Sequence, residues 1–353
     1  MDARQATLWI GGREIGAGRP VYVVAELSAN HRGRFDEAVS IVRAAREAGA
    51  DAIKLQTYTA DTLTIPSSAE PFRHDSGSVW AGRTLHDLYA EACTPWEWQP
   101  KLQELAHELG IELFSSPFDP SAVDFLETMQ VPAYKIASFE LVDLPLIRRV
   151  AATGKPLILS TGMATLEELD EALGAAREAG ASGVALLKCT SAYPAPAEEM
   201  NLRTIPALAE RFRVPVGLSD HTLGIAAPVA AVALGASIVE KHLTLSRAAG
   251  GPDAAFSLEP REFTEMVQAI RFAERALGEV RYAPTPREAE SRRFRRSLFV
   301  VRDVKAGEAL SADNVRSIRP AAGLPPRYLP ELLGRRARRA IAAGTPLSWD
   351  LVE

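Results

Sequence analysis

Two histidines stand out because each one ends a short apolar segment. His221 follows the segment 214–220, and His242 closes the next such segment, 236–242, in a chain with only six histidines. If the two segments are neighbouring parallel strands, both imidazoles can point to one spot at the same edge of the sheet. Two imidazoles that leave positions open for water and substrate suit a divalent metal ion. The placement therefore favours a metal site over ordinary hydrogen bonding.

Two lysines indicate an anion site in the same region. Lys54 and Lys135 lie near the ends of two other apolar segments, and a pair of cations can hold the phosphate and carboxylate of one small ligand. Hydroxyl donors end further segments: Ser116, Ser138, Ser160 and Ser219. Cations combined with hydroxyl donors suit a small phosphorylated carboxylate. The alternative is a Schiff-base aldolase in which Lys135 or Lys188 is the nucleophile.

The elements that must position these residues form a regular repeat. Short apolar, β-rich runs alternate with helical patterns that end in glycine, such as 35–49 and 166–180. The eight runs are 21–26, 51–57, 111–116, 133–138, 156–161, 183–191, 214–220 and 236–242. Eight strand–helix units predict an α/β fold, a (β/α)8 TIM barrel, rather than a doubly wound open sheet. Burying polar residues at the end of every run costs free energy unless these ends converge on a ligand that pairs with them.

Two segments depart from this repeat. Residues 7–16, TLWIGGREIG, predict a β-hairpin with a Gly-Gly turn that plugs the bottom of the barrel. The stretch 58–95 is much longer than an ordinary strand-to-helix connection, and it contains Trp80 and Tyr89. We therefore predict that it is an ordered lid over the mouth of the barrel, meaning the C-terminal ends of its strands.

The charge changes sign near the C-terminal end. The 353 residues carry a net charge of −5, but 14 basic and 8 acidic residues from Arg287 onward give this part +6 and leave −11 for the rest. Pro284 and Pro286 flank a predicted linker. We therefore divide the chain into a barrel with its hairpin (1–283), a linker (284–294) and a small basic domain (295–353). The basic charge is either a solvated surface or a contact for an acidic partner surface or an anionic substrate.

Composition excludes several classes of protein. With 47% hydrophobic and 24% charged residues, the chain is neither disordered nor collagenous nor a coiled coil. Its negative charge argues against a nucleic-acid partner, and no run approaches the roughly 18 apolar residues of a membrane span. Two cysteines are too few for a disulfide framework, which predicts a reducing, cytoplasmic location.

Several motifs resemble those of the sialic acid synthase family. They are AELSANH (25–31), GADAIKLQTY (49–58), FSSPFD (114–119), YKIASFE (134–140), GLSDHTLG (217–224), EKHLTL (240–245) and GGPDAAFSLEP (250–260), with RSLFVV and IRPAAGLPP in the tail. The resemblance runs from about residue 21 to the C-terminal end. Within the family, AELSANH, FSSPFD and KIASFE look most like the pseudaminic acid synthase branch. Sialic acid synthases proper have an Asn where this chain has Ser191, in the sugar-binding loop, which argues against N-acetylmannosamine as the substrate.

The resemblance implies a TIM barrel followed by an antifreeze-like (SAF) domain, here 295–353. It implies a transferase that condenses phosphoenolpyruvate with an acetamido sugar to give a nine-carbon 2-keto acid and phosphate. In the branch named above, the sugar is 2,4-diacetamido-2,4,6-trideoxy-L-altrose and the product is pseudaminic acid. The implied cofactor is a divalent metal, Mn²⁺ first and Mg²⁺ or Co²⁺ as alternatives. The implied assembly is a domain-swapped homodimer.

The resemblance also implies a role for each matching residue. Phosphoenolpyruvate-binding positions are Lys54, Ser116, Lys135, Ser138, Ser160 and Ser219. Positions around the sugar and the reacting carbons are Glu26, Gln56, Glu140, Ser191, Tyr193 and Asp253. His221 and His242 match the metal ligands, and Arg319 matches an arginine that reaches into the partner subunit's site. Glu26 and the two histidines form the catalytic set, because a carboxylate can stabilise developing positive charge or position water.

Besides the Schiff-base aldolase, three other functions remain open. The legionaminic and N-acetylneuraminic acid synthases use the same chemistry on sugars of different stereochemistry. A protein of a different class, a non-catalytic carbohydrate-binding protein with the tail as its binding module, would bind sugar without releasing phosphate. Binding alone, however, does not need two lysines and two metal-type histidines together.

Overall fold

The computed structural model describes residues 7–74 and 80–353. The chain divides into two compact units, Met1–Gly278 and Glu279–Glu353, which we describe separately. No helix within the described ranges has the length and apolar character needed to cross a membrane.

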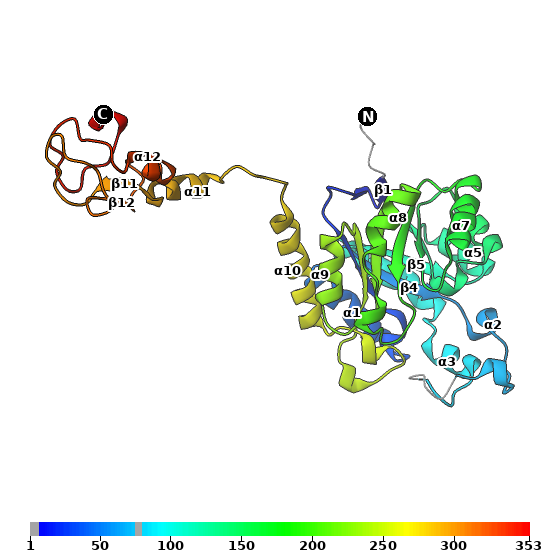
Figure 1. Ribbon diagram of the computed structural model, residues 1–353. Helices are drawn as coiled ribbons and strands as arrows, with labels where there is room; N and C mark the ends of the chain where they lie inside the picture. Colours follow the sequence, from blue (N-terminus) through cyan, green and yellow to red (C-terminus); the bar gives the residue numbers. More distant parts are fainter. Residues whose placement is uncertain (1–6, 75–79) are drawn as a thin grey trace. The chain divides into compact units, whose positions relative to one another are not determined.

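The first unit is a closed barrel of eight parallel strands (Figure 1). The strands are β3 (Tyr22–Glu26), β4 (Ala52–Thr57), β5 (Glu112–Pro117), β6 (Tyr134–Ile136), β7 (Leu157–Ser160), β8 (Val184–Cys189), β9 (Val216–Asp220) and β10 (Ile238–His242). They pair in chain order, and β10 closes the ring by pairing with β3. The predicted TIM barrel is thus confirmed, with each strand inside or close to the run predicted for it.

A helix follows each barrel strand and covers the outside of the sheet. The helices are α1 (Phe35–Glu47), α4 (Gln99–Glu108), α5 (Pro120–Thr128), α6 (Leu144–Ala151), α7 (Leu166–Glu178), α8 (Thr204–Phe212), α9 (Ala226–Ala233) and α10 (Pro260–Leu277). Their starts follow from local sequence: Asp119 caps α5, and Thr165 and Glu168 form a capping box on α7. Because helices cover the sheet, β3, β6, β7, β9 and β10 are buried at every residue.

The predicted N-terminal hairpin forms from β1 (Thr7–Ile10) and β2 (Arg13–Gly16). Its apolar side chains, Leu8, Ile10 and Ile15, are buried in the core of the barrel unit. A side chain on Gly183, the residue before β8, would lie 2.7 Å from a methyl carbon of Leu8. The hairpin therefore packs against the N-terminal ends of the strands, as a plug of the barrel bottom does.

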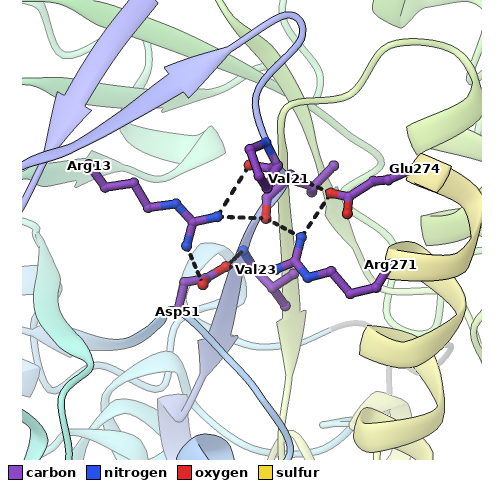
Figure 2. Close-up of polar contacts among 7 residues, drawn as sticks. Arg13, Val21, Val23, Asp51, Arg271 and Glu274 are labelled. Atoms are coloured by element: carbon purple, nitrogen blue, oxygen red, sulfur yellow. Dashed lines mark hydrogen bonds and ion pairs between the residues drawn. The ribbon is translucent and has the colours of Figure 1, made fainter. Parts of the chain in front are cut away.

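A polar network joins this hairpin to the last barrel helix (Figure 2). Asp51, just before β4, accepts hydrogen bonds from Arg13 of the hairpin and, at 3.1 Å, from Arg271 of α10. The backbone of Val21 accepts from the same two guanidinium groups and donates to Glu274 at 2.5 Å. The network ties the beginning and the end of the barrel sequence together at the bottom of the barrel.

The long connection after β4 is folded over the mouth. It contains α2 (Ala60–Leu63) and α3 (Leu85–Ala92), while residues 75–79 lie outside the described ranges. The indole nitrogen of Trp80 donates to the carbonyl oxygen of Pro252 at 2.9 Å, and its ring lies 5.6 Å from that of Tyr193. The described part of the connection thus contacts the loops that follow β8 and β10; its role as a lid stays a prediction.

The second unit has its own small core and contains β11 (Ser297–Val300), paired antiparallel with β12 (Val315–Ile318), and α12 (Leu329–Leu332). Its core includes Leu298, Val300, Val315 and Leu332. The segment 284–294, predicted as a plain linker, includes α11 (Pro286–Ser291) and belongs to this unit. Thr285 and Glu288 form a capping box there, which explains why a helix starts at Pro286.

Candidate active site

The predicted site residues of the barrel lie at its mouth, on its eight strands or on the loops that follow them. Strands β3 to β7 and their loops provide Glu26, Lys54, Gln56, Ser116, Lys135, Ser138, Glu140 and Ser160. Strands β8 to β10 and their loops provide Ser191, Tyr193, Ser219, His221, His242 and Asp253. Parallel strands in a barrel bring their C-terminal ends together, so the chain order of these residues becomes a ring.

Lys54 forms a buried ion pair with Glu26 across the two paired strands β3 and β4. The ammonium lies 2.5 Å from Glu26 Oε2, and both side chains are almost completely buried. Lys54 also donates to the hydroxyl of Ser116 at 3.4 Å, and Gln56 donates to Glu26 Oε1 at 3.3 Å. Four predicted residues thus form one connected polar group.

Lys135 completes this group through Glu240. Glu240 Oε1 lies 3.4 Å from the ammonium of Lys135 and 3.8 Å from that of Lys54, and it accepts from Ser219 at 2.9 Å. The second oxygen of Glu240 is buried without a hydrogen-bond partner, and so is the hydroxyl of Ser160. Such atoms in a buried polar group point to a ligand that would satisfy them.

Burial and charge act in opposite directions on these groups. Burial lowers the pKa of Lys135 below its ordinary value, although Glu240 partly opposes this. Burial would also lower the pKa of Lys54, but Glu240 and Glu26 outweigh it and keep that ammonium charged. Burial raises the pKa of Glu26 above its ordinary value despite the nearby Lys54. Glu26 is therefore a carboxyl group that can take up a proton near neutral pH.

A second group of donors surrounds Gly162, just after β7. The amide of Gly162 donates to the hydroxyl of Ser138 at 3.1 Å. A Cβ at this position would lie 2.2 Å from the hydroxyl of Ser191 and 2.6 Å from that of Ser138. Only glycine leaves room for the two serines to approach each other, so this residue is needed to bring the β6 and β8 loops together.

The two predicted metal ligands lie side by side. The rings of His221 and His242 are 5.2 Å apart, and both side chains are buried. His242 Nδ1 has no hydrogen-bond partner, and burial holds the pKa of His242 well below its ordinary value, so the ring is neutral. His221 Nδ1 lies 3.3 Å from the backbone oxygen of Thr190, an arrangement that leaves its other nitrogen for a ligand.

The neutral ring of His242, with its unsatisfied Nδ1, and the neighbouring ring of His221 fit a divalent ion whose remaining positions would be taken by water and substrate. Asp253 Oδ2 lies 3.8 Å from His242 Nδ1. Within the described ranges, no three His, Cys, Asp or Glu side chains gather as a metal cage. The fit is therefore to an open site with two protein ligands, not to a closed structural site.

Aromatic rings line one side of this pair. Tyr193 lies 4.6 Å from His221, and Phe256 lies 5.2 Å from Tyr193 and 5.0 Å from His242, measured between ring centres. Trp80, from the long connection after β4, extends the same wall. These rings give the site an apolar wall beside the two histidines, as pockets for small molecules commonly have.

Two predicted residues lie apart from these contacts. Glu140 is on a short 3₁₀ turn (Ser138–Glu140) after β6; one of its oxygens is buried without a partner, and burial raises its pKa to about 7. Arg319 is exposed and belongs to the second unit, immediately after β12. Its predicted role toward a partner subunit stays a prediction.

Two residues that contact the site were not among its predicted residues. Glu240 bridges both lysines, and Cys189 lies 3.9 Å from His221 Nδ1. Strand alternation holds the signal for Glu240, because residues two apart face the same side, and Glu240 precedes His242 by two. For Cys189 the sequence carries no comparable signal, since a lone cysteine in a strand is usually a core residue.

Comparison with protein families gives two matches. Residues 41–282 match the NeuB family, and residues 295–353 match the SAF domain. The pseudaminic acid synthase of Helicobacter pylori is 46% identical to this chain over 95% of the chain and 98% of that protein. The N,N'-diacetyllegionaminic acid synthase of Legionella pneumophila is 36% identical over 96% of each.

Solved structures give a consistent result. The N-acetylneuraminic acid synthetase of Leptospira borgpetersenii superposes with a TM-score of 0.72 at 30% identity, covering 81% of this chain and 95% of that one. A spore coat polysaccharide biosynthesis protein of Bacillus subtilis superposes with a TM-score of 0.67 at 35% identity, covering 99% of both chains.

Proposed function

Because the chain belongs to the NeuB family and ends in a SAF domain, we propose that it is a pseudaminic acid synthase. The enzyme condenses phosphoenolpyruvate with 2,4-diacetamido-2,4,6-trideoxy-L-altrose and releases phosphate. The observation that carries the proposal is the buried group at the mouth in which Lys54 and Lys135 share Glu240. The choice of sugar is supported by the 46% identity with the Helicobacter pylori enzyme, against 36% with the Legionella pneumophila enzyme that bears the legionaminic name.

Phosphoenolpyruvate is the anion for which the two lysines are arranged. Lys54 and Lys135 hold its phosphate and carboxylate, with the hydroxyls of Ser116, Ser138, Ser160 and Ser219 as further donors. Before the ligand binds, Glu26 and Glu240 balance the two ammonium charges. The anion competes with these carboxylates for the lysines, which favours protonation of Glu26, whose pKa is already raised by burial.

The condensation forms one carbon–carbon bond and breaks one carbon–oxygen bond. The enol carbon of phosphoenolpyruvate attacks the aldehyde carbon of the open-chain sugar, and protonated Glu26 gives its proton to the aldehyde oxygen, which becomes a hydroxyl. The former enol centre is left with positive charge, which the Glu26 carboxylate stabilises. Water adds there and gives a proton to Glu26; phosphate then leaves with the electrons of its carbon–oxygen bond, and the remaining hydroxyl loses its proton to become the ketone.

His221 and His242 would hold the divalent metal ion, for which Mn²⁺ is the first candidate and Mg²⁺ or Co²⁺ are alternatives. When bound, such an ion supplies Lewis acidity to the aldehyde oxygen of the sugar. The low pKa of His242 keeps this ring neutral, the form in which imidazole binds metals. Tyr193 and Asp253, which flank the two histidines, orient the sugar.

The assembly we propose is a domain-swapped homodimer in the cytoplasm. The SAF domain carries a net charge that is opposite in sign to that of the barrel, which supports its docking on a second copy. Arg319 is exposed in this domain, and its guanidinium can donate several hydrogen bonds to an acetamido oxygen or a sugar hydroxyl of the partner's substrate.

A panel of sugars tests the proposal. Each candidate sugar is incubated with phosphoenolpyruvate and Mn²⁺, and phosphate release is measured. We expect the highest kcat/KM with 2,4-diacetamido-2,4,6-trideoxy-L-altrose. A higher value with the legionaminic acid precursor or with N-acetylmannosamine would assign the enzyme to another branch of the family. Sugar binding without phosphate release from any pair would support a carbohydrate-binding protein instead.

A further inference from the structure

We propose that Lys241 is a positioning residue whose buried ion pair with Asp220 sets the spacing of His221 and His242. The inference rests on the metal role proposed for these two histidines, and it goes beyond that role because it names what holds them in place. Lys241 does not itself touch the mouth, because it lies on the outer face of β10.

The contacts of Lys241 surround His221 on both sides. Its ammonium lies 2.5 Å from Asp220 Oδ2 and also donates to the backbone oxygen of Thr222. Asp220 in turn accepts from the backbone amide of Thr222 at 3.0 Å and from its hydroxyl at 3.1 Å. The residues before and after His221 are therefore both bound to the residue that precedes His242.

Strand alternation explains how an outer pair acts on inner side chains. Lys241 and Asp220 are directly paired between β10 and β9. One position earlier, Ser219 and Glu240 form the matching inner pair, joined by a hydrogen bond of 2.9 Å. One position later come the two histidines. The outer pair and the inner pair thus hold β9 and β10 together near their ends, and the two imidazoles follow immediately after these pairs.

Burial makes a purely stabilising role a poor explanation for this pair. Lys241 and Asp220 are both completely buried, and removing two charges from water costs about as much as their attraction returns. A neutral apolar pair of similar size fills such a site equally well. What the charged pair adds is fixed geometry, because the ammonium holds a carboxylate and a backbone oxygen at the same time.

Metal affinity measured apart from activity tests the inference. The full-length protein is titrated with Mn²⁺ and free Mn²⁺ is followed by electron paramagnetic resonance, while phosphoenolpyruvate binding is measured by calorimetry. We expect Lys241→Met to weaken Mn²⁺ binding by about 10- to 100-fold, the range typical of losing a residue that orients metal ligands. Phosphoenolpyruvate affinity should change by less than about twofold, because Lys54 and Lys135 are untouched.

Two further variants separate positioning from folding. The double variant Asp220→Asn/Lys241→Met removes both charges, so no carboxylate is left buried without its cation. We expect this variant to fold, and to bind Mn²⁺ more weakly than the unaltered protein, as Lys241→Met does. Lys155→Met is the control. Lys155 lies just before β7 and forms an ion pair with Glu127 of α5, so its loss should leave Mn²⁺ affinity unchanged.

The outcomes discriminate between the inference and the proposed function. Unchanged Mn²⁺ affinity in the Lys241 variants, or an equal loss of Mn²⁺ and phosphoenolpyruvate binding, would overturn the positioning role. Failure of both variants to fold would do the same, since the pair would then serve the barrel as a whole. If His221→Ala binds Mn²⁺ as tightly as the unaltered protein, the metal role itself is wrong, whatever the Lys241 variants do.

Discussion

Replacing Lys135 by Met should weaken phosphoenolpyruvate binding far more than sugar binding. Lys135 is 2% exposed, and its only ion-pair partner among the described residues is Glu240 at 3.4 Å. Glu240 keeps Lys54 and Ser219 as partners after the substitution, so the fold loses little. Lys54 is less suited to the test, because its removal leaves Glu26 buried without the cation that lies 2.5 Å away.

The magnitude follows from one lost charged hydrogen bond. Such a bond is worth about 1.5–3 kcal/mol, and each 1.4 kcal/mol corresponds to roughly a tenfold change in Kd. We therefore expect the Kd of phosphoenolpyruvate to rise about 10- to 150-fold in calorimetric titrations of the Lys135→Met variant. The KM of the sugar should change only about twofold, because no predicted sugar contact is removed.

Lys188→Met is the matched control. Lys188 also lies near the end of a barrel strand, but its ammonium donates to the backbone oxygen of Cys189 and the hydroxyl of Thr190, not to the carboxylates of the mouth. Phosphoenolpyruvate affinity should be the same in this variant as in the unaltered protein. Equal losses for both substrates in Lys135→Met, or a borohydride-trapped Schiff base at Lys135 or Lys188, would refute the reasoning.

Four further predictions concern the rest of the site. His221→Ala and His242→Ala should each abolish phosphate release without lowering the melting temperature by more than a few degrees; full activity in a chelated, metal-free preparation would contradict this. Gly162→Ala should reduce kcat/KM strongly, because its Cβ would lie 2.2 Å from the Ser191 hydroxyl, whereas Gly174→Ala on α7, where a Cβ meets no atom within 4 Å, should be neutral in the same assay. Burial raises the pKa of Glu140 to about 7, so its stabilising contribution is complete below its ordinary value of 4.5 and is lost as the pH rises through 7. As the pH rises between these values, the free energy of unfolding should therefore fall more for the unaltered protein than for the Glu140→Gln variant, as measured by denaturant unfolding. If the two proteins show parallel pH curves, the burial argument is wrong. Finally, an Arg319→Ala chain mixed with a His221→Ala chain should partly recover activity after subunit exchange; no recovery in exchanged dimers would place Arg319 in its own subunit's site or outside any site.

The fold could be predicted because its two periodic signals are strong. The eight strands are covered by helices, so their sequences are continuous apolar runs, and the helices between them begin at residues such as Thr165 that cap them. The bounds were less predictable: the run 133–138 yields only Tyr134–Ile136, since Ser138 already belongs to a 3₁₀ turn. The helix in the predicted linker was missed because Pro284 and Pro286 look like breaks, although proline also starts helices.

The site was predicted in its residue types more than in its contacts. Strand ends identified both histidines and both lysines, because barrel geometry brings such ends together. Strand alternation places Glu240 on the same face as His242, but the sequence could not reveal that Glu240 connects the two lysines. Those contacts join β10 to β4 and β6, and they depend on how the closed barrel brings these strands together.

The network at the bottom of the barrel has a consequence for the newly made protein. Val21 and Glu274 are joined by a hydrogen bond although they lie 253 positions apart in the chain, and β3 pairs with β10. The barrel therefore cannot close until nearly the whole first unit has left the ribosome. At translation rates of about 5–20 residues per second, the partial sheet exists for some tens of seconds with two unpaired edges. Exposed edges of this kind pair readily with those of other chains. The synthesis interval before Arg271 and Glu274 emerge is thus the period in which we expect the nascent chain to depend most on chaperones.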